Sequence, residues 1–312
     1  MNYRAILIAA LEAVGLYVAG FLVPVLGQVV ALFTPVPIIM SYVRDGRREG
    51  LSAIVIATGI IAVLAGWQVA AILLFSFGLM AIGIAEAMLR RLKAEYVALA
   101  GGLLPVVIMG ISLAYYFINI NKNPVAVIES YLGKSLAESA KMYSDLGLKE
   151  MSVIITSVSS SFIHYLARLV PGIVITTFVF QAASCFGVVR ALLIRKPDND
   201  IALAWPSLAA WYAPDSWVWG LIVSLSLIAI PQETARFAGF NAAILLGVIY
   251  TAQGMAIVEH YFRKAGIHTV VRGLLHTAIL ILPVIVCVTA LGVVDIWADF
   301  RKVRHPVVDL KA

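Results

Sequence analysis

Four polar side chains stand out in an otherwise apolar sequence because together they could hold a small polar or anionic solute. They are His164, Arg168, Arg236 and Asn241. His164 and Arg168 are four residues apart, so they share one face of a helix. Sites for small molecules are mostly apolar and carry a few convergent polar groups. The sequence therefore predicts a solute site from these residues; the alternative is that they lie at the ends of membrane helices and reach lipid headgroups.

The first apolar stretch, RAILIAALEAVG, carries small residues at four-residue spacing, namely Ala5, Ala9 and Ala13. Helices in lipid associate through close packing, which small residues at this spacing permit. The functional interpretation is a docking face for a partner subunit. The structural alternative is that these alanines pack against another helix of the same chain.

Glu12 places an ionisable group in the same stretch. Inserting Asp, Lys or Arg at the centre of a membrane helix costs roughly 2.5–3.5 kcal/mol, and a glutamate should be similar in kind. We therefore expect Glu12 to face protein or water, or to be protonated. Two interpretations stay open: an ion-coupling or proton-relay role, and a carboxylate that is satisfied structurally or reaches the inner membrane surface.

The elements that carry these residues must be membrane helices. The 312 residues are 62% hydrophobic and 13% charged, whereas soluble domains are roughly 45–50% apolar and about 25% charged. A single soluble core cannot hide so much apolar surface. Strand-like alternation is absent, and only helices or closed barrels satisfy the backbone in lipid. The sequence thus predicts an all-α integral membrane protein.

Uncharged runs predict a polytopic helical bundle of eight or nine transmembrane helices. One further helix, at about 123–150, is amphipathic, and we expect it on the outer membrane surface or as a lid over a cavity. Asn123 can cap this helix and Pro124 suits its first turn. The predicted spans are 5–23, 27–43, 51–66, 68–88, 96–121, 169–189, 217–232, 237–258 and 273–294.

The distribution of Lys and Arg predicts a multi-pass protein of the cell inner (plasma) membrane with a cytoplasmic N-terminus. In this orientation 12 basic residues fall on the inner side and six in the outer loops, as the positive-inside rule requires. With nine spans the basic tail DIWADFRKVRHP falls outside; with eight it falls inside. One short span would then be re-entrant.

No motif for a catalytic, metal or cofactor site is present. The sequence lacks GxxxxGK[ST], HExxH and a GxGxxG that follows a strand. Cys185 and Cys287 form no CxxC pattern, and no third ligand is suitably spaced from the histidines. We therefore expect no enzyme activity, metal or cofactor. Nucleic acid is not expected as a partner, because the basic residues are spread over loops. Transport would need a separate ATPase or an ion gradient.

Over nearly its whole length the chain resembles the YybS-like family of uncharacterised bacterial polytopic membrane proteins. The resemblance is carried by PVPIIMSYVRDGRREG, PDSWVWGLI, Asn241 with Tyr250 and Gln253-Gly254, and LGVVDIWADFRK. The region PVLGQVVALFTPVPIIMSYVRDGRREGLSAIVI also resembles substrate-binding S components of energy-coupling factor (ECF) transporters. That resemblance implies a six-span core that binds a solute and docks on a transmembrane coupling subunit with ATPases, through small residues such as Ala5, Ala9 and Ala13.

These resemblances favour a membrane subunit that binds a small solute from outside and relies on partner subunits for energy. The expected domains are an S-component-like core at 1–194, a cytoplasmic or interfacial linker at 195–214, and two or three further spans with a tail at 215–312. The alternative is a structural or regulatory membrane subunit that scaffolds other proteins without transport. A polar cavity in the outer half would favour the first function, and a close-packed bundle with an exposed apolar face the second.

Overall fold

The computed structural model describes residues 3–23, 26–158, 160–195, 204–205, 207–279 and 284–302. All regular elements in these ranges are helices. The first are α1 (Tyr3–Leu22), α2 (Leu26–Ala31), α3 (Pro35–Arg44), α4 (Arg47–Ala65), α5 (Trp67–Ile72), the π-helical turn η1 (Leu73–Gly78), α6 (Leu79–Leu89) and α7 (Ala94–Ile120). Then come α8 (Pro124–Asp145), α9 (Lys149–Thr156), α10 (Ser160–Ile194), the short η3 (Leu208–Ala210), α11 (Trp217–Ala229), α12 (Glu233–Lys264), α13 (Thr269–Ile279) and α14 (Val284–Ala298).

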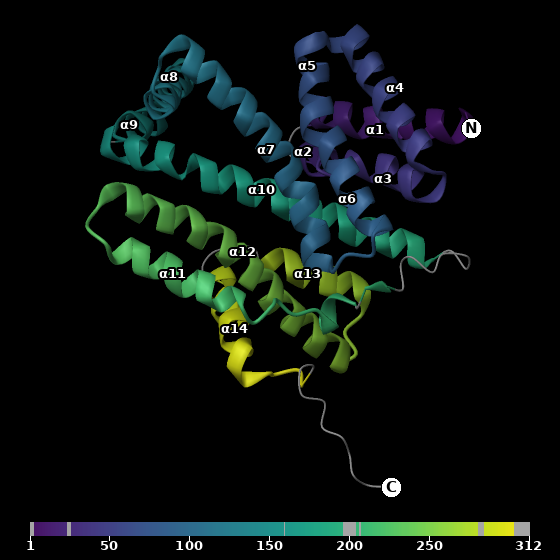
Figure 1. Cartoon of the computed structure of the whole chain (residues 1–312). Coiled ribbons are helices and arrows are strands. Elements are labelled where there is room, and N and C mark those ends of the chain that lie inside the picture. Colours follow the sequence, from purple (N-terminus) through teal and green to yellow (C-terminus); the bar gives the residue numbers. More distant parts are fainter. Residues whose placement is uncertain are drawn as a thin grey trace, which may run out of the picture.

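The described helices confirm an all-α membrane protein. Seven segments are long and apolar enough to cross a membrane, and α11 and α14 are shorter apolar helices. Two of the seven are composite: α2 continues into α3, and α5 continues through η1 into α6. Figure 1 shows α1–α7 and α10 packed together, with α11–α14 on one side of α10. Of the predicted linker 195–214, residues 196–203 and 206 lie outside the described residues.

Ion pairs and hydrogen bonds gather the basic turns at one end of the bundle, which we call the basic end. Arg47 at the start of α4 binds Glu86 near the end of α6 at 2.6 Å. The Trp205 indole donates to the Leu92 carbonyl between α6 and α7 at 2.7 Å. Arg190 near the end of α10 donates to the Trp205 carbonyl at 2.7 Å. The opposite end, where α10 and α12 begin, is called the distal end below.

Small residues pack α1 into the core of its own chain. Ala9 is 5% exposed and Ala13 is fully buried, and Ala9 clusters with Ala53 and Ala57 of α4. Ala9 and Ala13 therefore do not form the predicted docking face for a partner, because α1 uses the close approach that they permit against α2, α3 and α4. Ala5 is only half-buried, and its docking role stays a prediction.

Glycines bring α6, α7 and α10 into close contact. A Cβ atom added to Gly102 of α7 would collide with the backbone of Val179 in α10. In the same way, a Cβ on Gly83 of α6 would collide with the backbone of Ala100 in α7. Because the helix backbones approach so closely here, dispersion contacts hold the helices together where the hydrophobic effect cannot. These contacts fix the wall of α7 and α10 that is used below.

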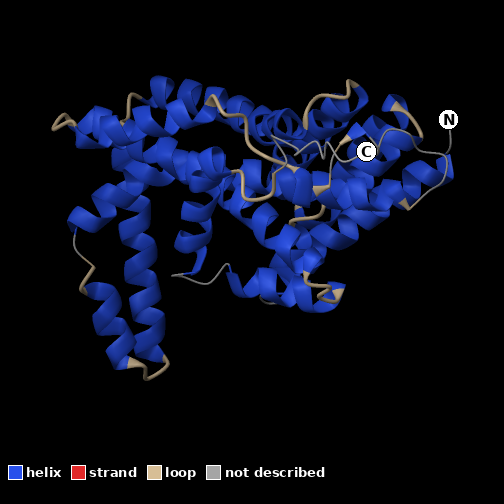
Figure 2. Ribbon diagram, turned by 90° about the horizontal axis from the view of Figure 1, so that it is seen from below, coloured by secondary structure: helices blue, strands red, loops and turns tan. Residues whose placement is uncertain are grey.

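The predicted amphipathic helix is confirmed as α8, which forms a hairpin with α9 at the distal end. Figure 1 views α8 nearly end-on, and Figure 2 shows the hairpin projecting from the body of the molecule. Asn123 caps α8 by accepting a hydrogen bond from the Val125 N–H at 2.9 Å. Most of the hairpin is exposed, including apolar side chains such as Met142 and Val153. Such a surface suits a helix lying on a membrane.

The predicted last span, 273–294, falls on α13 and α14. The described part of α13 ends at Ile279 and α14 begins at Val284. Residues 280–283 lie outside the described residues.

The start of the C-terminal tail lies at the basic end. Tyr261, in the last turn of α12, donates a hydrogen bond to the Phe300 carbonyl at 3.1 Å. The start of the tail therefore lies at the same end of the bundle as the other basic turns. The number of spans, eight or nine, stays a prediction.

Two glycines allow α12 and α14 to cross at backbone contact. A Cβ on Gly254 would collide with the Val288 carbonyl, and a Cβ on Gly292 would collide with the Tyr250 carbonyl. Side chains cannot give way here, because the obstacle in each case is backbone. The crossing therefore depends on glycine at both positions, and it places α14 against the middle of α12.

We predict that Gly254→Ala destabilises the protein, because overpacking of a tight contact typically costs about 1–3 kcal/mol. The matched control is Gly247→Ala on the same helix, where an added Cβ meets nothing within 4 Å. Thermal unfolding in detergent should show a lower midpoint for Gly254→Ala and an unchanged or higher midpoint for Gly247→Ala. Equal midpoints for the two variants would contradict the close crossing.

Candidate functional site

Charged side chains from three helices form a network at the distal end. The two ring nitrogens of His164 lie 2.6 Å from the Glu129 carboxylate of α8 and 3.0 Å from the Glu233 carboxylate of α12. Arg168 Nη1 lies 3.0 Å from the same Glu233 oxygen. Because an ionised carboxylate only accepts hydrogen bonds, both His164 nitrogens must donate, which requires the doubly protonated ring. The network ties the α8–α9 hairpin to the bundle.

Asn241 braces α10 at the point where Pro171 interrupts its backbone hydrogen bonds. The Asn241 side-chain oxygen accepts from the Gly172 N–H, and its nitrogen donates to the Arg168 carbonyl at 3.0 Å. In an uninterrupted helix this carbonyl and this N–H bond each other directly. A Cβ on Gly172 would collide with Asn241, so glycine is required for the insertion. Both ends of the Asn241 amide are therefore used within the fold.

The structure brings together His164, Arg168 and Asn241 but leaves Arg236 outside the network. Arg236 donates instead to the Pro231 carbonyl at 3.2 Å. Within the network each carboxylate already contacts a cation, so these groups satisfy one another and do not converge on an open site. A solute is not needed to explain any of these contacts.

Neither acidic member of this network, Glu129 or Glu233, was among the predicted solute residues. The spans of the sequence do place Glu233 at the same level as His164 and Arg168, but they do not pair it with them. Glu129 lies on the polar side of the amphipathic helix, where any one of several charges could have been the partner of His164. Pairing across 35 residues of sequence is a property of the tertiary fold, so spacing along the chain does not reveal it.

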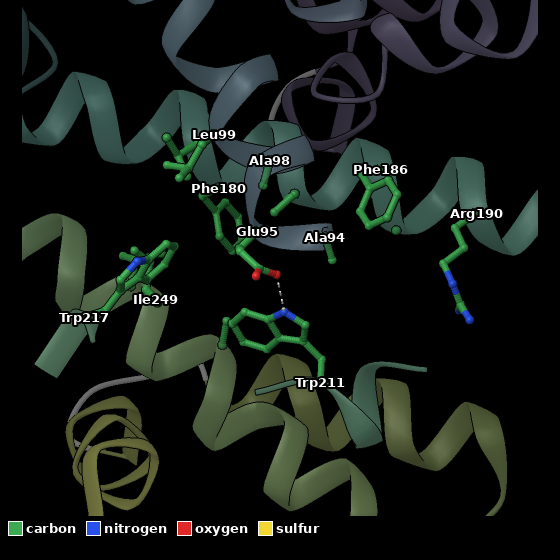
Figure 3. Close-up of a pocket in the computed structure, with 15 residues that line it drawn as sticks. Ala94, Glu95, Ala98, Leu99, Phe180, Phe186, Arg190, Trp211, Trp217 and Ile249 are labelled. Atoms are coloured by element: carbon green, nitrogen blue, oxygen red, sulfur yellow. Dashed lines mark hydrogen bonds between the residues drawn. The ribbon is translucent and has the colours of Figure 1, made fainter. Parts of the chain in front are cut away.

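A cavity lies between α7, α10 and α12, toward the basic end. Its volume is about 360 Å³, within the range of roughly 300–1,000 Å³ found for small-molecule sites. Most of its wall is apolar, and Figure 3 shows its aromatic and charged side chains. Those used below are Glu95, Phe180, Phe186, Arg190, Trp211 and Trp217. The sequence predicted a polar recess at the outer ends of the spans, and this cavity lies elsewhere.

Two charged groups line the cavity, and they point in different directions. In Figure 3 the Glu95 carboxylate is directed toward Trp211, whereas the Arg190 guanidinium is directed away from Glu95. The distance from Trp211 Nε1 to the Glu95 carboxylate is 3.5 Å, at the outer limit of a hydrogen bond. Arg190 is bound to the Trp205 carbonyl. The cavity thus has one carboxylate whose hydrogen-bonding capacity is largely unused.

A buried ion pair holds the wall segment that carries Trp211. Arg301 Nη2 lies 2.9 Å from the Asp295 carboxylate, and both side chains are 1% exposed. The other terminal nitrogen of Arg301 donates to the carbonyls of Ala209 and Trp211 at 3.0 and 2.8 Å. Removing one partner of a buried pair typically costs about 3–5 kcal/mol. The LGVVDIWADFRK segment therefore has a structural role that sequence analysis did not assign.

Gln253 completes this buried network from α12. Its side chain is fully buried. Its nitrogen donates to the Asp295 carboxylate at 3.1 Å, and its oxygen accepts from the Ala213 N–H at 3.1 Å. Both ends of the amide are used, as a buried polar group requires. Gln253 therefore fixes the non-helical segment around Trp211 directly against α12.

Glu12 is exposed on α1, contrary to the expectation that it faces protein. No hydrogen bond or ion pair to its carboxylate occurs within the described ranges. Glu86, another carboxylate in an apolar helix, accepts hydrogen bonds from Arg47 at 2.6 and 2.9 Å and from Tyr42 at 2.8 Å. Arg90, one turn after Glu86 on the chain, lies 3.6 Å from the same carboxylate. Contact of Glu12 with water, and its protonation, stay predictions.

No group of three His, Cys, Asp or Glu side chains in the described part of the chain is arranged to hold a metal ion. Glu129, His164 and Glu233 are close together, but a metal needs a lone pair on a neutral imidazole. Both His164 nitrogens instead face carboxylate oxygens, with the Arg168 cation adjacent. This arrangement suits an ion-paired link between α8, α10 and α12.

We predict that His164→Ala loosens the hairpin, because His164 joins α8 to α12. Hydrogen–deuterium exchange should become a few-fold faster across α8 and its turn to α9. Glu129→Gln should act in the same direction, and Glu138→Gln, an exposed site on the same helix, serves as the control. If exchange across α8 is identical in His164→Ala and the wild type, His164 does not hold α8 to the bundle.

Comparison with known proteins places the chain in a family. The family model described as predicted membrane protein (DUF2232) matches residues 12–296. Searches of curated proteins and of solved structures gave no match. The family match begins within α1 and includes the cavity and Asp295 of the buried network, but its description names no solute, partner or reaction. The chain belongs to the DUF2232 family of predicted membrane proteins.

Proposed function

We propose that this protein binds a small amphipathic solute in the cavity between α7, α10 and α12. The single observation that supports this is the cavity itself, with about 360 Å³ of space and few polar groups in an aromatic wall. Such walls gain affinity from apolar contact, and sparse polar groups set the orientation of the ligand. A purely close-packed scaffold has no need for a cavity of this size, since packing voids are normally much smaller.

In this proposal the chain acts in the manner of an S component. Of the six spans in the first part of the chain, α7 and α10 line the cavity, and α12, the start of α11 and the Trp211 segment complete its wall. The sequence has no phosphate-binding loop, so energy for transport would come from a coupling subunit with ATPases. Docking would use a surface other than Ala9 and Ala13, because helices of the same chain cover those residues.

The orientation in the membrane is also part of the proposal. The chain lies in the inner membrane of the cell. The positive-inside rule then puts the basic end and the N-terminus on the cytoplasmic side. The cavity then lies in the inner half of the protein and the α8–α9 hairpin on the outer surface. A solute taken up from outside would be held near the side on which it is released.

The proposed function is tested by filling the cavity. Gly187 lies on α10 in the cavity wall, and an added Cβ meets nothing within 4 Å, so Gly187→Leu should fold. Protein purified in mild detergent is extracted, and mass spectrometry identifies the bound small molecules and proteins. We expect a molecule that is retained by the wild type and lost from Gly187→Leu.

The matched control is Gly110→Leu on α7. An added Cβ at Gly110 also meets nothing within 4 Å, but Gly110 is not part of the cavity wall. This variant should keep the molecule. Equal retention by both variants would contradict binding in the cavity. A wild-type chain that carries protein partners but no small molecule would favour the alternative function, a scaffold without transport.

A further inference from the structure

We infer that the cavity selects an organic cation, meaning an ammonium group carried on an apolar body. This inference rests on the proposed function and names the class of solute. It is based on the juxtaposition of one under-used carboxylate with two indole and two phenyl rings.

Glu95 is the acidic group of the cavity wall. Its carboxylate makes no ion pair within the described residues, and its hydrogen bond from Trp211 Nε1 is long, at 3.5 Å. Glu86, by contrast, accepts three short bonds from its own chain. A carboxylate in apolar surroundings favours any cation that can reach it. Glu95 lines the cavity, and Figure 3 shows its carboxylate directed toward Trp211.

Aromatic rings surround the position next to this carboxylate. Trp211 and Trp217 come from the segment after α10 and the start of α11, and Phe180 and Phe186 come from α10. The faces of indole and phenyl rings attract cations, and quaternary ammonium groups are recognised by such aromatic walls. The rings also provide apolar contact for the uncharged part of the ligand. Anions gain nothing from either feature.

Arg190 is the basic group of the cavity wall and does not cancel this preference. Its guanidinium donates to the Trp205 carbonyl at 2.7 Å, and in Figure 3 it points away from Glu95. The positive and negative sides of the cavity are therefore separate. An ammonium group placed by Glu95 and Trp217 would lie on the negative side.

Glu95 also has a structural alternative, because it lies in the first turn of α7. An acidic residue there stabilises a helix through the macrodipole. The two roles are distinguishable: a helix-capping role affects stability alone, whereas a ligand role affects the preference between charged and neutral ligands. The experiment therefore compares two ligands of the same shape.

The probes are benzyltrimethylammonium and neopentylbenzene, which differ by exchange of a quaternary nitrogen for a carbon. Isothermal titration of detergent-solubilised full-length protein should give tighter binding of the cation by at least about tenfold, as expected for a charge contact with cation–π support. Glu95→Gln should abolish the preference while still binding neopentylbenzene. Trp217→Leu should reduce the preference, and Glu150→Gln, exposed on α9, should leave it intact.

The outcomes separate the inference from the proposed function. Equal affinity of the wild type for both probes overturns the cation preference and leaves the cavity as a binding site. A preference that survives in Glu95→Gln overturns the role of this carboxylate, even if the variant is less stable. Binding of neither probe to the wild type overturns both the solute class and the cavity as the binding site.

Discussion

The buried pair of Asp295 and Arg301 is the interaction on which the rest of the candidate site depends. Buried backbone groups outside regular helices must find partners elsewhere in the protein. Arg301 pairs two carbonyls of the segment around Trp211, and Gln253 pairs the Ala213 N–H. Without these contacts the segment would have no fixed position, and Trp211 would not form a wall of the cavity.

Close helix contact and open space occur side by side in this fold, and the difference has a simple cause. Where α7 meets α10, Gly102 lets the backbones touch, whereas toward the basic end aromatic side chains of α10, α11 and the Trp211 segment line the cavity beside α12. The fold is thus tight where small residues face each other and hollow where rings face a carboxylate. A binding function uses both properties, since a rigid wall keeps the cavity open in the absence of ligand.

Local and additive properties could be predicted from the sequence, and pairings between distant segments could not. Uncharged runs identified the spans because lipid burial sums over about 20 residues, and Asn123 identified the start of α8 because capping acts within one turn. The contact between Glu95 and Trp211 joins residues 116 positions apart, and no spacing rule reveals it. His164 was singled out correctly as chemically distinctive, but its carboxylate partners come from α8 and α12. The alanine stripe was recognised as a packing surface, yet its spacing does not say which helix covers it.

Arg301, which follows α14, and Gln253 of α12 hold the Trp211 segment in place. Hydrogen–deuterium exchange of residues 209–213 measures this directly, with Arg301→Gln compared with Arg263→Gln, whose native arginine is half-exposed and pairs with Glu259. We expect strongly accelerated exchange of this segment in Arg301→Gln, with α1–α6 unchanged and Arg263→Gln like the wild type. Wild-type protection of residues 209–213 in Arg301→Gln would contradict it.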